Sequence, residues 1–116
     1  MANRIVWFDI PVEDLVRAME FYSKVLDISV EESQGVAVLE HSGSDVAGCL
    51  FKSDDEKPSA SGVLLYFNVS GRLNEALNAV EQCDGSILSP QENIGEHGYR
   101  AIVLDSEGNR IALHSE

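Results

Sequence analysis

The side chains that could do chemistry are few and lie far apart along the chain of 116 residues. Among the three histidines, His114 is the strongest candidate for an acid, a base or a ligand contact. We expect His41 at the surface and His97 in a loop bracketed by glycines. Cys49 and Cys83 are expected to be buried and inert, as free cysteines commonly are. The sequence has no phosphate-binding loop, dinucleotide-binding glycine pattern, GxSxG elbow or HExxH motif, which excludes those enzyme classes.

The acidic composition narrows the classes of partner. The sequence has 8 Lys and Arg against 20 Asp and Glu, a formal net charge of −12. A surface this acidic repels phosphate backbones and anionic lipids, so we expect neither nucleic acid nor a membrane as a partner. The sequence shows no apolar run of membrane-spanning length and no apolar leader, so a cytoplasmic protein is expected.

Two stretches share the pattern of a strand followed by a helix. Residues 5–12 form an apolar run typical of a strand, and residues 13–27 have the apolar spacing of a helix, with Glu13 and Asp14 in the expected first turn. Residues 62–69 again predict a strand. Residues 72–83 again predict a helix, with one apolar face made by Leu73, Ala76, Leu77 and Val80.

The segments that follow the two helices also match each other. Residues 36–43 (VAVLEHSG) and residues 101–108 (AIVLDSEG) each contain an apolar strand, an acidic residue and a turn closed by glycine. Each half of the chain is therefore expected to be a βαβββ module. The remaining strands of the two modules are predicted at 29–32, 46–52, 86–89 and 110–114.

The repeat predicts a single α+β domain over residues 1–116, with one module at about 3–52, the other at about 62–115, and a polar connector between them. One helix can cover only one face of a curved four-stranded sheet, so the concave face is left for a partner or a ligand. We therefore expect curved mixed sheets around a shared cleft, which is a usual site for a small molecule.

Two segments carry a resemblance to a known family. The opening FDIPVEDLVRAMEFYSKVLDI and the ending GYRAIVLDSEGNRIALHS resemble the corresponding parts of the vicinal oxygen chelate superfamily, also called the glyoxalase/bleomycin resistance/dioxygenase group. The resemblance covers nearly the whole chain and implies the same fold, commonly assembled as a homodimer. It does not imply one reaction, because the superfamily contains lyases, isomerases, dioxygenases, resistance enzymes and non-catalytic binding proteins.

Catalytic members of this family hold a divalent metal with His, Glu or Gln side chains on the first and last strands of the two modules. Carried over onto this sequence, three of the ligand positions fall at Trp7, Leu64 and Ala112, none of which can bind a metal. The fourth falls at Ala47, Cys49 or Phe51. The resemblance therefore implies a member without metal or other cofactor, with an apolar and aromatic pocket.

Strand alternation extends the set of cleft residues. Side chains alternate along a strand, so the residues two positions after Trp7, Leu64 and Ala112 are expected to face the cleft as well. The expected function is the binding of a small hydrophobic or aromatic molecule by Trp7, Asp9, Cys49, Phe51, Leu64, Tyr66, Ala112 and His114. Structural roles remain open for some of them: Trp7 as a core plug, Asp9 as a solvated acid, and Tyr66 or His114 at a solvated sheet edge.

Two other functions stay open. In one, Glu40, His41 or His114 helps to hold a metal, and the protein is a glyoxalase-like lyase or isomerase, or a dioxygenase. That function requires at least three oxygen or nitrogen ligands that converge on one point. In the other, Trp7 closes a vestigial cleft and the protein is a structural or regulatory dimer.

Overall fold

Each half of the chain folds into one helix and one four-stranded sheet, as the internal repeat predicts. The computed structural model describes residues 3–116. The first half contains β1 (Trp7–Val12), α1 (Leu15–Leu26), β2 (Val30–Ser33), β3 (Val36–Leu39) and β4 (Ala47–Lys52). The second half contains β5 (Tyr66–Asn68), α2 (Leu73–Gln82), β6 (Ser86–Asn93), a short 3-10 helix (Gly95–His97), β7 (Tyr99–Leu104) and β8 (Arg110–Ser115).

The two sheets have the same topology. The strand orders are β1–β4–β3–β2 and β5–β8–β7–β6, and in each sheet the first and last strands of the module are parallel neighbours. The parallel register places Asp9 opposite Cys49 in the first sheet and Tyr66 opposite Ala112 in the second. All other neighbouring strands are antiparallel. The predicted α+β fold of two βαβββ modules is confirmed.

Helix α1 starts two residues later than predicted. Asp14 is its N-cap, and the Asp14 side chain accepts a hydrogen bond of 3.0 Å from the backbone N–H of Arg17. The prediction that Glu13 and Asp14 lie in the first turn is therefore wrong. Both acids precede the turn, because the Asp14 carboxylate is used to cap it. The helix ends at Asp27, which adopts a left-handed conformation with φ of 56°.

Two strands of the second module also differ from their predicted bounds. β5 covers only Tyr66–Asn68, although residues 62–69 predicted a strand. The chain turns just before it, where Gly62 has a φ of 97° and the backbone N–H of Ser61 donates to the Ser59 hydroxyl. β6 extends beyond residue 89 and through Pro90, which an edge strand tolerates because it has an unpaired side.

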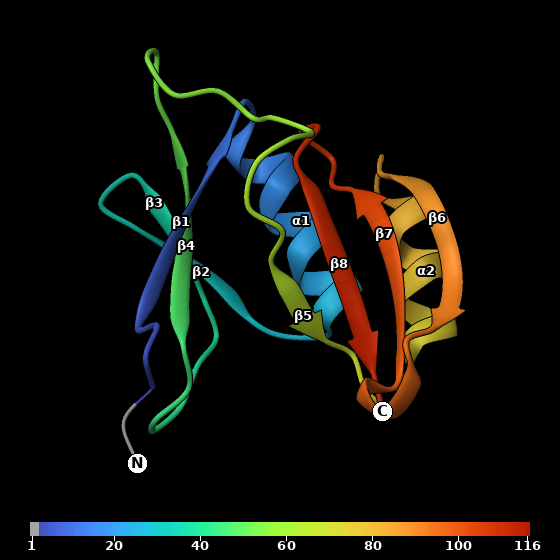
Figure 1. Ribbon diagram of the computed structural model, residues 1–116. Helices are drawn as coiled ribbons and strands as arrows, with labels where there is room; N and C mark the ends of the chain where they lie inside the picture. The colour runs from blue at the N-terminus through green and yellow to red at the C-terminus, as the bar shows by residue number, and fades with distance from the viewer. Residues whose placement is uncertain (1–2) are drawn as a thin grey trace.

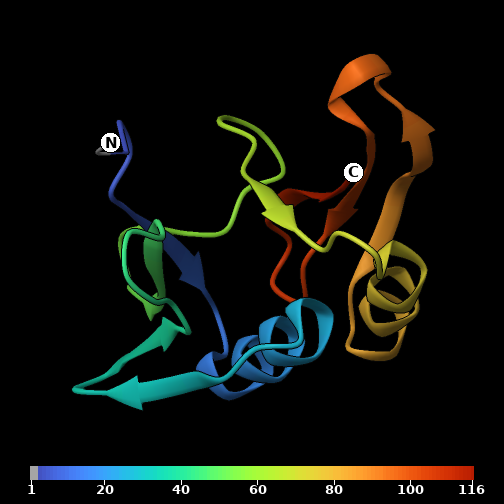
Figure 2. The same ribbon diagram turned by 90° about the horizontal axis from the view of Figure 1, so that it is seen from below.

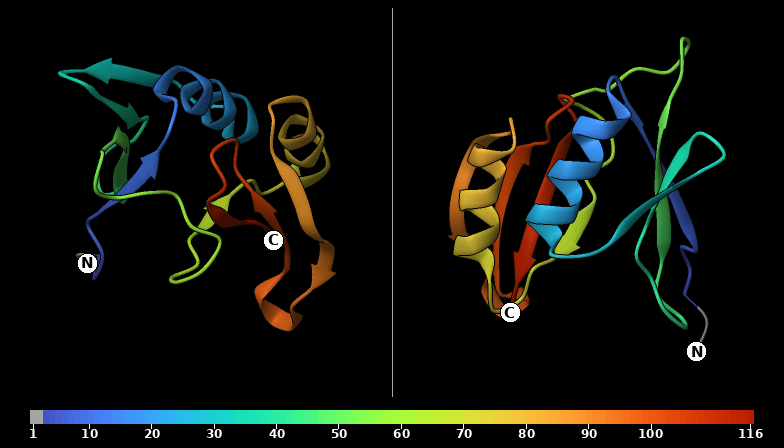
Figure 3. Two further views of the ribbon diagram at one scale, coloured as in Figure 1. Left: turned by 90° about the horizontal axis from the view of Figure 1, so that it is seen from above. Right: turned by 180° about the vertical axis from the view of Figure 1, so that it is seen from behind.

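The helices and both sheets share one hydrophobic core. Helix α1 packs on β2, β3 and β4 and lies beside α2, which packs on β6 and β8 (Figures 1 and 3). Both helices lie on the same side of the molecule (Figure 2). The ring of Phe67 on β5 packs 5.7 Å from that of Phe8 on β1 and 5.8 Å from that of Tyr22 on α1. No helix in the part of the chain described here is long and apolar enough to cross a membrane.

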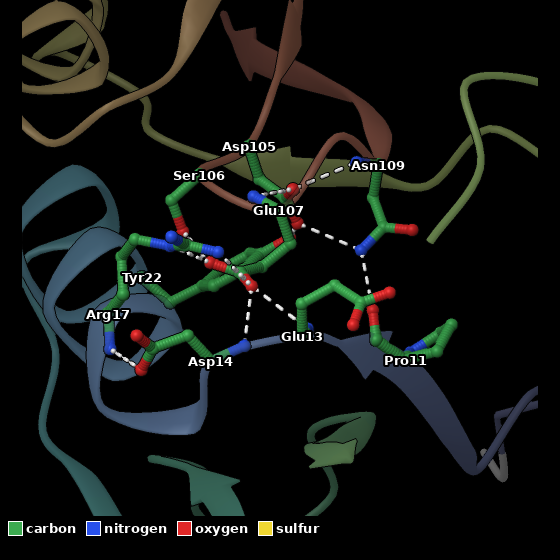
Figure 4. Close-up of polar contacts among 9 residues, drawn as sticks. All are labelled: Pro11, Glu13, Asp14, Arg17, Tyr22, Asp105, Ser106, Glu107 and Asn109. Carbon is green, nitrogen blue, oxygen red and sulfur yellow. Dashed lines mark hydrogen bonds and ion pairs between the residues drawn. The ribbon is translucent and has the colours of Figure 1, made fainter. Parts of the chain in front are cut away.

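Glu107, in the turn between β7 and β8, ties the second module to the first (Figure 4). Its carboxylate accepts the backbone N–H groups of Glu13 and Asp14 at 2.9 and 2.8 Å, and it pairs with the Nε of Arg17 at 2.7 Å. Burial alone would raise the pKa of Glu107, but the hydrogen bonds from Arg17, Asp14, Ser106 and Glu13 lower it to about 2. A turn of one module thus stabilises the N-terminus of the helix of the other.

Asp105 and Asn109 complete this joint between the modules. The buried Tyr22 hydroxyl donates to Oδ2 of Asp105 at 2.6 Å. Asn109 donates to the same oxygen at 3.1 Å and to the backbone carbonyl of Pro11 on β1 at 2.8 Å (Figure 4). The DSEGN segment that contributes to the family resemblance therefore has a structural task in this protein.

Candidate functional site

The first group of predicted site residues meets on the first sheet. Trp7 and Asp9 are exposed on β1, whereas Ile10 and Val12 are buried toward the helix, so the predicted alternation is present. The indole Nε1 of Trp7 donates to Oδ1 of Asp9 at 2.7 Å. The thiol of Cys49 donates to the same oxygen at 3.2 Å. These three residues are called the Trp7 cluster below.

The Trp7 cluster is not suited to nucleophilic chemistry. Burial, together with the hydrogen bond to the Asp9 carboxylate, raises the pKa of the Cys49 thiol to about 11. At neutral pH the sulfur therefore keeps its proton, and a protonated thiol is a poor nucleophile. Both cysteines are buried, as predicted, and the pKa of the Cys83 thiol is also raised, chiefly by burial.

The second group lies on the other sheet, around Tyr66. Tyr66 and His114 alternate with Phe67 and Leu113, which belong to the core, so they lie on the sheet face turned away from it. Their rings are 6.4 Å apart between centroids. Arg100 on β7 lies opposite His114, donates from Nη1 to the Tyr66 hydroxyl, and places its guanidinium 5.9 Å from the Tyr66 ring centroid.

The hydrogen bonds fix the chemical character of these groups. His114 Nε2 lies within hydrogen-bond distance of the backbone carbonyl of His97. A carbonyl can only accept, so Nε2 is the donor in this contact, and in the tautomer with its proton on Nε2 the lone pair lies on Nδ1. The Tyr66 hydroxyl accepts from Arg100 and, among residues 3–116, has no acceptor for its own proton. The face thus offers one acceptor nitrogen and one donor hydroxyl.

A cavity of about 550 Å³ covers this group, lined by Tyr66, Ile94, His97, Arg100 and His114. It is called the Tyr66 cavity below. Of the predicted ligand-binding residues, only Tyr66 and His114 line it. Trp7, Asp9 and Cys49 lie on the other sheet, Phe51 is half-buried on β4, Leu64 is half-buried just before β5, and Ala112 is buried on β8.

Sequence reasoning did not place Arg100 and Ile94 in the site. One signal could have placed Arg100. It directly precedes the segment 101–108 that predicts a strand, and it shares a strand face with Ile102, two residues later. Its side chain is shared between Tyr66 and Glu92, whose carboxylate lies 2.8 Å from Nε. Arg100 therefore pairs with a nearby carboxylate and also contacts an aromatic side chain.

The residues at the family's metal positions do not fit a metal ion. Trp7, Leu64 and Ala112 offer no ligand atom, and the Cys49 thiol is committed to Asp9. Across residues 3–116, no group of three His, Cys, Asp or Glu side chains converges as a metal site would require. Glu40 and His41 border a separate hollow that does not include His114.

Comparison with known proteins identifies the family of this chain and solved structures with the same fold. The family model described as the Glyoxalase/Bleomycin resistance protein/Dioxygenase superfamily matches residues 4–113. A glyoxalase/bleomycin resistance protein from Albidiferax ferrireducens T118 superposes with a TM-score of 0.79 at 17% identity, covering 98% of this chain and 100% of that one. Comparison with curated protein sequences finds no significant match.

Two further solved structures have the same fold. An integron cassette protein of V. Cholerae is 23% identical with a TM-score of 0.66, and the match covers 99% of this chain and 96% of that one. The fosfomycin resistance protein FosX from Mesorhizobium loti is 13% identical with a TM-score of 0.71, and the match covers 100% and 93%. At these identities the structures show the shared fold, while the family model covers nearly the whole sequence. The chain belongs to the glyoxalase/bleomycin resistance protein/dioxygenase superfamily.

Proposed function

We propose that this protein binds a small aromatic molecule in the Tyr66 cavity without the help of a metal ion. The observation that carries the proposal is the lining of that cavity, which combines an exposed tyrosine ring, an aliphatic side chain and a few polar groups. Its volume of about 550 Å³ suits a small organic ligand. A binding role is also supported by the residues at the family's metal positions, because Trp7, Leu64 and Ala112 offer no atom that could hold a metal for Lewis-acid chemistry.

Three of the lining residues have a definite part in this function. The Tyr66 ring packs against the plane of the ligand, and its hydroxyl proton is available to a ligand oxygen or nitrogen. The Nδ1 lone pair of His114 accepts a hydrogen bond from a ligand N–H or O–H. Arg100 holds the Tyr66 ring in place through its hydrogen bond and its position near the ring face.

We further propose that the protein is a homodimer in which the Trp7 cluster of one copy covers the Tyr66 cavity of the other. The first residue of β1 and the two residues before it support this: Trp7, Ile5 and Val6 are 45%, 63% and 71% exposed. Apolar side chains that adjoin in this way favour a protein partner. The homodimer and the cytoplasmic location stay predictions.

Light scattering after gel filtration tests the dimer. The proposal predicts twice the chain mass of 12.7 kDa for the wild type and a monomer for the Val6→Glu variant. Val6 is exposed, so the substitution leaves the core intact. A monomeric wild type at high micromolar concentration would overturn the dimer but leave the ligand site standing.

Ligand binding is tested with a panel of planar aromatic compounds, first by thermal shift and then by calorimetry. We expect one-to-one binding by at least one compound and a loss of about tenfold or more in affinity in the His114→Ala and Tyr66→Leu variants. His41→Ala is the matched control. His41 is exposed, follows β3 of the first sheet and does not line the Tyr66 cavity. Equal binding by His114→Ala and the control would overturn the site.

A further inference from the structure

A second cavity, of about 330 Å³, lies along the seam between β1 and the start of β8. It is called the seam cavity below. Its apolar lining comes from Phe8, Ile10, Pro11, Val63, Leu65 and Ile111. It shares no lining residue with the Tyr66 cavity. Phe8 and Ile10 alternate with Trp7 and Asp9 along β1, so these two apolar side chains lie on the core side of that strand.

The polar rim of the seam cavity contains an arginine whose hydrogen bonding is incomplete. Arg110 donates from Nη2 to the backbone carbonyl of Gly62 at 2.9 Å. Its Nε is buried, and no acceptor for it exists among residues 3–116. A buried guanidinium N–H without an acceptor is costly, and a carboxylate is the group that its geometry fits best.

Arg110 also has no acidic partner within the chain. It takes part in none of the ion pairs of the described residues, as is true of Arg4, Lys52 and Arg72. Lys57 adds a second cation at the same rim. Its ammonium lies 3.8 Å from the Glu13 carboxylate and is half exposed, so the pairing is loose.

The acidic residue in the lining, Asp9, does not pair with Arg110 or Lys57. Asp9 borders the seam cavity, but its side chain lies on the opposite face of β1, where Oδ1 accepts hydrogen bonds from Trp7 and Cys49. Asn109 also lines the cavity, and its amide is fully used by Pro11, Asp105 and Ser59. The rim therefore presents positive charge above an apolar floor.

We propose that the seam cavity is a second small-molecule site, specific for an amphipathic carboxylate. The apolar body of the ligand packs on Phe8, Leu65 and Ile111, and the carboxylate accepts hydrogen bonds from the guanidinium of Arg110, with Lys57 nearby. The proposal is independent of the Tyr66 cavity. A volume of about 330 Å³ limits the ligand to a small molecule, of the size of a medium-chain or simple aromatic acid.

Calorimetry with octanoate, and with octanol as its uncharged counterpart, tests this site. We expect octanoate to bind the full chain one to one, and the Arg110→Gln variant to lose about tenfold or more in affinity, because a charge-assisted hydrogen bond is removed. Arg100→Gln is the matched control, since that arginine lines only the other cavity. Octanol is expected to bind more weakly and to be indifferent to Arg110→Gln.

A second variant keeps the test decisive if Arg110→Gln does not fold. Val63 lines the seam cavity and is 85% exposed, so Val63→Glu leaves the core intact while it adds a negative charge at the mouth. The proposal predicts that Val63→Glu loses octanoate binding and retains the aromatic ligands of the Tyr66 cavity. Absence of octanoate binding to the folded wild type at millimolar concentration, or an equal loss in Arg100→Gln, would overturn it.

Discussion

Arg17 and Glu107 are separated by most of the chain, yet their side chains meet at 2.7 Å and join the helix of the first module to the last turn of the second. The Glu107 side chain is fully buried, while that of Arg17 is 41% exposed. The carboxylate also accepts two backbone N–H groups at the start of α1. The contact therefore serves as a helix cap and a module joint at once.

Loss of this carboxylate charge is expected to destabilise the protein. Glu107→Gln removes the ion pair and leaves Arg17 and the helix N-terminus without an anion, at a cost of about 2–4 kcal/mol in the free energy of unfolding. Urea denaturation measures the change. Glu20→Gln is the control, because Glu20 belongs to an exposed pair with Lys24 and should cost well under about 1 kcal/mol. Similar values for the two variants would contradict the assigned role of Glu107.

The same carboxylate gives stability a defined pH dependence. The pKa of Glu107 is about 2 in the folded chain and 4.5 as the ordinary value, so the folded state favours the ionised form. Its contribution is complete above about pH 4.5 and is lost as the pH falls toward 2. Denaturation curves between pH 6 and 2 should show a steeper loss for the wild type than for Glu107→Gln. Parallel pH profiles would contradict the lowered pKa.

Gly48 on β4 is required for the packing of Phe8. A Cβ atom at residue 48 would lie 2.4 Å from the Phe8 ring, which has no room to move without disturbing its contact with Phe67. Gly48→Ala is expected to cost about 1–3 kcal/mol through overpacking. Phe8→Leu should recover part of that cost in the double variant, so a double-mutant cycle measured by thermal unfolding checks the pair. Additive effects would show that the two residues do not interact.

The thiol of Cys49 is expected to react slowly. Its pKa of about 11 leaves little thiolate at pH 8, and Asp9 is one of the causes. In a Cys83→Ala background, alkylation by iodoacetamide should be faster in the Asp9→Asn variant than with Asp9 intact, because the negative charge beside the sulfur is gone. Equal alkylation rates with Asp9 and with Asp9→Asn would mean that the hydrogen bond between Cys49 and Asp9 is absent in solution.

The repeat pattern was sufficient to predict the fold, because strand and helix periods are local and occur twice. The face of each strand was also predictable: Trp7 and Asp9 share one face, and Tyr66 and His114 share another. The distance between these two pairs was not predictable. The apolar pattern of a single sequence carries no information on how two sheets are placed relative to each other. The strand predicted at 62–69 is limited to Tyr66–Asn68, and the chain bends at Gly62, where the φ of 97° is not visible in the apolar pattern.

The polar joint between the modules was missed for a related reason. The sequence placed Asp105 at the end of a strand and Glu107 in the turn after it, which is the usual location of such residues, and it assigned no contact to Asn109. Their partners, among them Tyr22 and Pro11, lie about 80 or more residues away in the sequence. Only the folded chain brings them together.

The central claim is that a small aromatic molecule binds in the Tyr66 cavity without metal, and its most direct test is a titration of chelator-treated protein. Elemental mass spectrometry first confirms that the treated protein contains no transition metal. Calorimetry with the aromatic compound selected by thermal shift should then give the same affinity before and after treatment, and a loss of about tenfold or more in Tyr66→Leu. Affinity that disappears with the metal and returns when it is added back would contradict the account.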